Sequence, residues 1–243
     1  MQLRPEIRQL LKPLSMHKQL AQCVFRDDEG RLFIEGDWYP KPLPSNIVLD
    51  EMCYPDTSYS FQNFFSNKPV GFRLGYASGN YGHSVFSTGV NGEINIGKYV
   101  VLQCSRIICN LSITIKDHCM FSWGSVITDS WLTETVSPLI KRKMLEIASR
   151  STNRYIEFEE PRPVIIEENV WVGFEAVILP GVTVGRGAVI GCKTIVSEDV
   201  PAYAVAVGSP ARVIKYLNPN DSTETKEKAL NCLHDKGGFG RRP

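Results

Sequence analysis

The sequence lacks any apolar run long enough to cross a membrane. None of its 243 residues belongs to a segment approaching the roughly 20 consecutive apolar residues that a membrane helix needs. The first residues also do not form the apolar core of a signal peptide. An excess of one charge is lacking too, because 27 basic residues are balanced by 26 acidic ones. This balance argues against nucleic acid or an anionic membrane surface as a partner, and we expect a cytoplasmic protein.

Paired cysteine motifs are also missing. The seven cysteines are odd in number and scattered, and no two have Cys-x-x-Cys spacing: Cys23, Cys53, Cys104, Cys109, Cys119, Cys192 and Cys232. This pattern favours reduced thiols in a cytoplasm over a disulfide framework or a zinc cage. No metal cofactor is expected.

The most regular part of the sequence runs from Ile166 to Pro201 and repeats every six residues. An aliphatic residue opens each unit: Ile166, Val172, Ile178, Val184, Ile190 and Val196. A small or β-branched residue follows four places later: Val170, Ala176, Val182, Ala188, Thr194 and Val200. A period of six fits neither an α-helix nor a long strand. It predicts a short strand, a corner and another short strand.

Three such units predict one turn of a triangular coil. Each turn is expected to stack on the next at the roughly 4.7–4.9 Å spacing of paired strands. Ile166 would then lie against Val184, and Val172 against Ile190. A single unit cannot bury its own apolar side, so the stacked array is the unit of stability.

A looser version of the repeat precedes the regular units. Aliphatic or aromatic residues recur at Val90, Ile96, Leu102 and Ile108 and, after one extra residue, at Ile115, Phe121 and Ile127. Residues 128–165, between the two sets, are too many for a corner and predict a loop directed outward, which on such scaffolds is usually functional. Within this loop, Ser137 and Pro138 predict the N-cap and first residue of a helix.

We expect three regions along the chain. Residues 1–84 form an N-terminal α/β appendage, residues 85–217 form the repeat domain with its outward loop, and residues 218–243 form a polar tail. Short helices are expected over residues 1–14 and 221–234.

The appendage contains two recognisable segments. Residues 18–38 predict a hairpin that turns at Asp27–Gly30. Residues 52–76 are rich in aromatic side chains, for which core packing and a substrate platform are both open interpretations.

These motifs resemble those of the hexapeptide-repeat acyltransferases. The similar phrases are Val-Trp-Val-Gly at 170–173, Ile-Leu-Pro-Gly-Val-Thr-Val-Gly at 178–185 and Gly-Ser-Pro-Ala-Arg-Val-Ile at 208–214. The resemblance implies a mainly β fold, a left-handed parallel β-helix. The repeat alone does not give the hand, since ordinary parallel crossovers are right-handed.

The resemblance also implies a function. It predicts a transferase that uses acyl-coenzyme A, most simply acetyl-CoA, as co-substrate and acts on a hydroxyl or amine of a sugar or sugar nucleotide. Such activity belongs to surface polysaccharide synthesis. A homotrimer with active sites between subunits is implied as well.

Six residues match family positions that contact the coenzyme: Gly173, Gly191, Cys192, Ser197, Glu198 and Arg212. Small residues suit a narrow groove for the pantetheine arm, and Arg212 suits a charge-assisted bond to phosphate, with Lys193 or Lys215 nearby. A cap on the last coil is the alternative role for Arg212. Glu198 departs from the family pattern, which often has lysine there, and its carboxylate repels phosphate.

The catalytic base of the resembled family is missing. There, a histidine acts as general base just past a Ser-Trp-Gly phrase. Here the phrase stands at 122–124, but residues 128–165 contain no histidine. Asp129 and His83 are the remaining candidates, although a carboxylate of ordinary pKa, about 3.9, is a weak base unless burial raises that pKa. His118 is expected to have a structural role at a corner.

Two functions therefore stay open. The first is the acetyltransferase just described. The second is a catalytically degenerate protein that serves as a binding or assembly subunit, favoured by Ser130 and Trp131 at the place of the missing histidine. Carbonic anhydrases built on the same repeat need three histidines from adjacent coils, and no such set is found.

Overall fold

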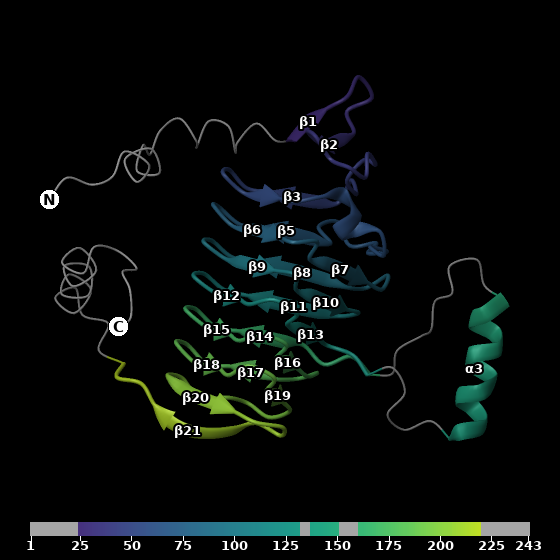
Figure 1. Cartoon of the computed structure of the whole chain (residues 1–243). Coiled ribbons are helices and arrows are strands. Elements are labelled where there is room, and N and C mark those ends of the chain that lie inside the picture. Colours follow the sequence, from purple (N-terminus) through teal and green to yellow (C-terminus); the bar gives the residue numbers. More distant parts are fainter. Residues whose placement is uncertain (1–23, 132–136, 151–159, 220–243) are drawn as a thin grey trace, which may run out of the picture.

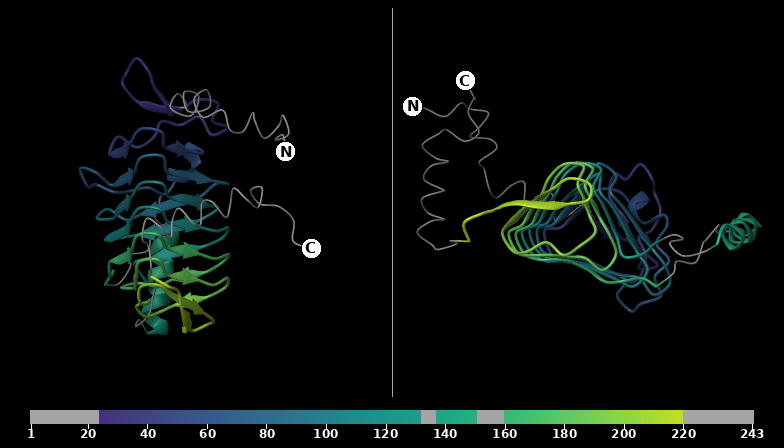
Figure 2. Two further views of the ribbon diagram at one scale, coloured as in Figure 1. Left: turned by 90° about the vertical axis from the view of Figure 1, so that its left-hand side faces the viewer. Right: turned by 90° about the horizontal axis from the view of Figure 1, so that it is seen from below.

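The computed structural model describes residues 24–131, 137–150 and 160–219. Their strands follow a rising coil and stack into three sheets of parallel strands (Figure 1). Viewed along the coil axis, the chain traces a triangle with one sheet on each side (Figure 2).

The three sheets are named by their numbers of strands in the described residues. The six-stranded sheet contains β3 (Ile47–Leu49), β5 (Phe72–Leu74), β8 (Glu93–Ile96), β11 (Ser112–Ile115), β14 (Val164–Ile166) and β17 (Thr183–Val184). The eight-stranded sheet contains β4 (Tyr54–Pro55), β6 (Gly79–Tyr81), β9 (Val101–Gln103), β12 (Met120–Phe121), β15 (Trp171–Val172), β18 (Val189–Ile190), β20 (Ala204–Val207) and β21 (Arg212–Tyr216). The five-stranded sheet contains β7 (Val85–Thr88), β10 (Arg106–Cys109), β13 (Val126–Thr128), β16 (Val177–Ile178) and β19 (Ile195–Val196). All these pairings are parallel except that of β20 with β21.

The chain visits the sheets in a fixed order, from six to eight to five strands and back to six. The turns between them make three corners, named after the sheets they join. The eight–five corner consists of residues 82–84, 104–105, 122–125, 173–176 and 191–194. The outward loop leaves from the five–six corner, between β13 and β14.

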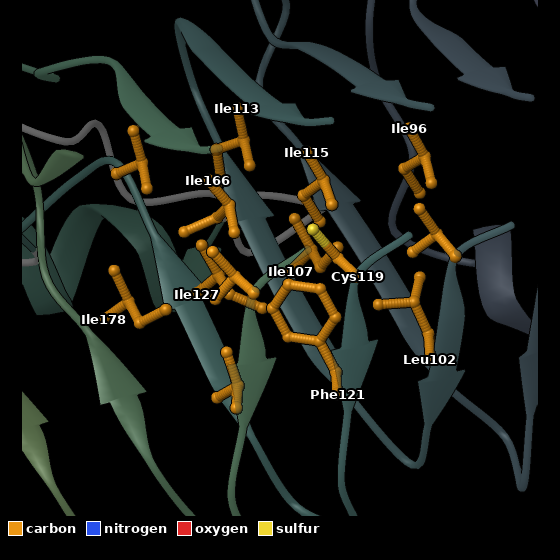
Figure 3. Close-up of a cluster of buried hydrophobic side chains, with 14 of the residues drawn as sticks. Ile96, Leu102, Ile107, Ile113, Ile115, Cys119, Phe121, Ile127, Ile166 and Ile178 are labelled. Carbon is orange, nitrogen blue, oxygen red and sulfur yellow. The ribbon is translucent and has the colours of Figure 1, made fainter. Parts of the chain in front are cut away.

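The core consists of columns of side chains that point into the coil. Ile166 pairs with Val184, and Val172 with Ile190, as the period of six predicts. The column that contains Ile166 continues into the preceding coil through Ile115. All five of these side chains are at most 1% exposed. Figure 3 shows such stacked residues. The stacked aliphatic core is thus confirmed.

Two assignments in the looser repeat are wrong. Val90 is 49% exposed at the five–six corner, and Ile108 faces away from the core. Ile107 is fully buried instead and pairs with Ile127 of the next coil. The corner at residues 104–105 is shorter than the period of six requires. The inward-facing residue of β10 therefore comes one position earlier than expected, at Ile107 instead of Ile108.

The coil also begins earlier than the sequence indicates. β3 pairs in parallel with β5, and β4 with β6, so the chain from Ile47 onward belongs to the stack and not to an appendage ending at residue 84. Large rings replace aliphatic columns here. Phe61, at the end of the 3-10 helix η1 (Ser58–Phe61), lies 5.0 Å from Phe72, whose ring lies 4.6 Å from Phe86. Rings and longer corners hide the period of six.

The hairpin is confirmed near the start of the described chain. β1 (Val24–Arg26) and β2 (Leu32–Ile34) pair antiparallel around the predicted turn. The helices expected over residues 1–14 and 221–234 lie outside the described residues.

The helix predicted in the outward loop is present as α3 (Pro138–Arg150). The Ser137 hydroxyl accepts a hydrogen bond from the Ile140 N–H, as expected of an N-cap. The helix stands away from the stack in Figure 1 and in the right-hand view of Figure 2. Leu139, Ile140 and Ile147 are more than half exposed on it.

Candidate functional site

Asp129 lies where the outward loop leaves the stack, and its side chain is fully buried. Its carboxylate accepts hydrogen bonds from the backbone N–H groups of Asn110, Leu111 and Ser112, at 2.7–3.0 Å. The Ser130 hydroxyl donates a further bond. The carboxylate therefore holds the neighbouring turn of the five–six corner, and this environment does not suit the catalytic base predicted from the sequence.

The two ends of the outward loop meet at this point. The Asp129 carbonyl accepts a hydrogen bond of 2.8 Å from the Arg162 N–H. Cys109 lies close to the Asp129 carboxylate. Burial together with the Asp129 charge raises the pKa of the Cys109 thiol well above its usual range. Trp131, next along the loop, is partly buried, and its Nε1 has no hydrogen-bond partner within the described segments.

Gly173 and Gly191 occupy equivalent places on neighbouring coils of the eight–five corner. A Cβ added to Gly173 would lie 2.7 Å from the backbone nitrogen of Cys192, and one added to Gly191 would lie 2.7 Å from a Val207 methyl group. Close packing of the coils therefore requires both glycines. The Cys192 thiol is exposed beside them. These three predicted coenzyme residues are brought together on one edge.

An aromatic pair that the sequence analysis did not single out lies on the same edge. The rings of Trp123 and Phe174 stack at 5.3 Å and 19°, and both residues are about half exposed. The adjacent Trp171 donates its Nε1–H to the Ser122 hydroxyl at 3.3 Å. Phe121 and Val172 pair across neighbouring strands, and each ring lies two positions after one of them. This equal spacing is the signal that would have revealed the stack.

The other predicted coenzyme residues lie near the C-terminal end of the stack. Glu198 and Arg212 line a hollow of ≈ 240 Å³, and the exposed Ser197 directly precedes Glu198. Arg212 donates one hydrogen bond to the Ala211 carbonyl at 2.8 Å. Asp199, which the sequence analysis did not predict as a site residue, accepts a hydrogen bond from the Thr183 N–H. This bond helps to close the last coil.

His83 lies at the eight–five corner near the other end of the stack. Its backbone N–H donates to Asp56 Oδ2 at 3.0 Å, and its Nδ1 lies 3.8 Å from the same oxygen. The imidazole is 61% exposed in its side chain. Burial and the Asp56 charge both raise the pKa of the nearby Tyr81. Of the two predicted bases, His83 is the exposed one, and a carboxylate holds its backbone N–H.

His118 lies at the six–eight corner, as part of the coil's turning geometry. Its backbone has a φ of 60°, and its ring stacks on Tyr99 at 5.0 Å. Asn169, in the next coil, has nearly the same φ of 61°. This placement fits the predicted structural role.

No group of three or more His, Cys, Asp or Glu side chains among the described residues could hold a metal ion. In the same residues, no helix is both long enough and apolar enough to span a membrane.

Comparisons with known proteins identify the repeat within this coil. Residues 163–198 match the family model "Bacterial transferase hexapeptide (six repeats)". This match identifies hexapeptide repeats in the C-terminal coils, from β14 to β19. The chain is 29% identical over 136 residues to the galactoside O-acetyltransferase of Lactococcus lactis, a match that covers 56% of this chain and 54% of that protein.

A second relative matches over a shorter stretch. The 2,3,4,5-tetrahydropyridine-2,6-dicarboxylate N-acetyltransferase of Staphylococcus aureus is 47% identical over 81 residues, which cover 33% of this chain and 34% of that protein. The matched segments thus span from a third to about half of these relatives' own length.

Solved structures share the fold. A hexapeptide-repeat acetyltransferase of Vibrio cholerae, complexed with acetyl coenzyme A, has a TM-score of 0.50 at 22% identity and covers 65% of this chain and 74% of its own. A variant of the N-acyltransferase AntD of Bacillus cereus has a TM-score of 0.51 at 16% identity, covering 79% and 88%. The predicted fold class, a mainly β left-handed parallel β-helix, is confirmed.

Proposed function

We propose that this protein transfers an acyl group, most simply acetyl, from acetyl-CoA to a hydroxyl or amine of a sugar or sugar nucleotide. The observation that carries the proposal is the composition of the eight–five corner. Gly173, Gly191 and Cys192 provide an exposed edge of backbone and small side chains at one end. The His83–Asp56 pair lies further along the same edge.

The length of this edge suits the coenzyme. Four strand pairings separate β18, which precedes Cys192, from β6, which precedes His83. At the spacing of paired strands, these four steps span roughly 19 Å. That span is comparable to an extended phosphopantetheine arm. A coenzyme whose nucleotide lies at the C-terminal end would thus bring its thioester toward His83.

In the proposed reaction, His83 acts as the general base. Its imidazole takes the proton from the acceptor hydroxyl or amine as the acceptor atom attacks the thioester carbonyl carbon. The carbon–sulfur bond then breaks, and the departing sulfur receives the proton from the imidazolium. Asp56 holds the backbone N–H of His83 and places a carboxylate oxygen 3.8 Å from the imidazole Nδ1. Asp129 is assigned a structural role.

The nucleotide end of the coenzyme is assigned to the hollow at the last coil. Arg212 is the cation that lines it, and Lys215 follows on the same strand, β21. Glu198 lines the hollow too and opposes a phosphate there. Substituting Arg212 with Ala should weaken coenzyme A binding measured by calorimetry, and an unchanged dissociation constant would leave Arg212 only a capping role.

One observation favours the second function, a binding or assembly subunit. The Trp123–Phe174 stack covers the middle of the edge along which the pantetheine arm would run. Rings in that position either flank the arm or obstruct it. The transfer assay below separates these cases.

The test compares native protein, His83→Ala and Asp129→Asn in acetyl transfer to a panel of sugars and sugar nucleotides. Loss of a general base should lower kcat by roughly 10²–10⁴-fold in His83→Ala. Asp129→Asn should keep the activity of its folded fraction. Full activity in His83→Ala removes His83 from the mechanism. A native protein that binds coenzyme A but transfers nothing supports the binding subunit.

We further propose a homotrimer. Apolar residues dominate the outward faces of two adjacent sheets: Val101, Met120, Trp171 and Val189 on the eight-stranded sheet, and Val126, Val177 and Ile195 on the five-stranded sheet. Met120 and Trp171 are more than 40% exposed. Two different apolar faces supply both halves of a head-to-tail contact, which closes into a ring. The coenzyme edge lies where these faces meet.

A further inference from the structure

Trp38 is an exposed ring fixed in place at the N-terminal end of the eight–five corner. It is 60% exposed. Its ring contacts Tyr59 at 5.3 Å, Tyr39 at 5.7 Å and His83 at 5.8 Å. One side of the indole is therefore supported by neighbouring rings while much of its surface faces solvent.

The turn that carries Trp38 is held by the preceding residue. Asp37 accepts hydrogen bonds from the Thr57 hydroxyl at 2.7 Å, the Ser58 N–H at 2.7 Å and the Tyr39 N–H at 3.0 Å. Burial acts to raise the pKa of Asp37, but these bonds outweigh it and the pKa is lowered. The ring thus sits on a preorganised support, which lowers the entropic cost of binding a ligand.

Two polar groups lie near the Trp38 ring: His83, which the indole contacts, and Asp56, which lies against His83. Asp56 is oriented toward His83, and the 3.8 Å contact places carboxylate and imidazole together. The Asp56 charge acts on the nearby Tyr81, where it contributes to a raised pKa. The Tyr81 ring stacks on that of Tyr54, with ring centroids 5.2 Å apart. A flat apolar surface beside a carboxylate and an imidazole is complementary to a pyranose, which has one apolar C–H face and a rim of hydroxyl groups.

We propose that Trp38, Asp56 and His83 form the binding site for a pyranose ring of the acceptor, which stacks on the indole and donates a hydroxyl to the carboxylate. This inference rests on the proposed function and assigns its acceptor to the N-terminal coils. The site lies on the same edge as the coenzyme groove. A hydroxyl bound beside Asp56 is then within reach of His83, the proposed base.

The test measures sugar binding without any acyl donor. Methyl β-D-galactopyranoside, methyl β-D-glucopyranoside and methyl 2-acetamido-2-deoxy-β-D-glucopyranoside serve as probes in saturation-transfer NMR on the full chain. We expect the ring C–H protons of at least one probe to receive saturation. Trp38→Ala should weaken that binding by about tenfold or more, which corresponds to 1.4 kcal/mol, and Trp38→Phe should restore part of it.

A matched control comes from another corner. Tyr76 is also an exposed aromatic residue, packed edge-on against Tyr99, and Tyr76→Ala should leave sugar binding unchanged. Binding that survives Trp38→Ala within twofold overturns the site, as does a native chain that binds none of the three glycosides. Calorimetry with coenzyme A distinguishes that failure from failure of the proposed function, because coenzyme binding does not involve Trp38.

Discussion

At the residue scale, Asp129 shows how a plausible catalytic position becomes a structural one. The sequence places a carboxylate directly after a strand and at the start of the outward loop, and that much is correct. Its partners are backbone N–H groups of residues 110–112, one coil away. Backbone donors leave no signature in side-chain chemistry, so the sequence could not distinguish an anchored carboxylate from a free one.

Replacing Asp129 should therefore cost stability. Asp129→Ala leaves three part-buried N–H groups without their acceptor, and an unsatisfied donor costs roughly 1–3 kcal/mol when it is buried. We expect a loss of several kcal/mol in the free energy of unfolding by urea. Asp199→Ala is the matched control, because that exposed carboxylate accepts one N–H, from Thr183, and its loss should cost about 1 kcal/mol. Equal losses in the two variants would contradict the anchoring role.

Cysteine labelling provides a second prediction at this scale. Cys192 and Cys104 are exposed, whereas burial raises the pKa of Cys119 to about 11, which keeps it a thiol at neutral pH. Iodoacetamide at pH 8 should modify the first two and spare Cys119 in the folded protein, as read by peptide mass spectrometry. Coenzyme A should then protect Cys192 and Cys104 together, because both lie on the eight–five corner along which the pantetheine arm would run. Equal labelling with and without coenzyme would place the coenzyme elsewhere.

At the element scale, the short strands are specified by alternation between core and surface. In β11, Ile115 is 1% exposed while Thr114 faces outward. Ile115→Ala should lower the free energy of unfolding by about 2–5 kcal/mol through lost burial and a residual cavity. Thr114→Ala, one residue away, should stay within about 0.5 kcal/mol. Comparable losses for both would mean that the column does not carry the stability of the coil.

The elements that the sequence predicted best are those with the least variation in length. Units from Ile166 onward keep a strict period, and each predicted neighbour is found. The first coils escaped detection because the rings of Phe61, Phe72 and Phe86 replace aliphatic residues in the core and the corners between the strands vary in length. The Trp123–Phe174 stack and the Trp38 support were missed for a related reason. Each joins residues distant in sequence, and only the register of the coils brings them together.

At the scale of the whole molecule, the two apolar sheet faces and α3 predict association. Light scattering should give a mass three times the 27.3 kDa of the chain at micromolar concentration. Ile140→Glu combined with Ile147→Glu, one face of α3, should shift the mass toward that of a single chain. Lys141→Glu, on another face of the same helix, is the control and should not. A native chain that scatters as a monomer would rule out the trimer.

The bond between Asp129 and Arg162 has a consequence for how such a protein changes over generations. This hydrogen bond joins the two ends of the outward loop at the stack. A change in the length of the segment between them therefore does not alter the pairing of the coils. New sequence can be grafted there without disturbing any register below or above.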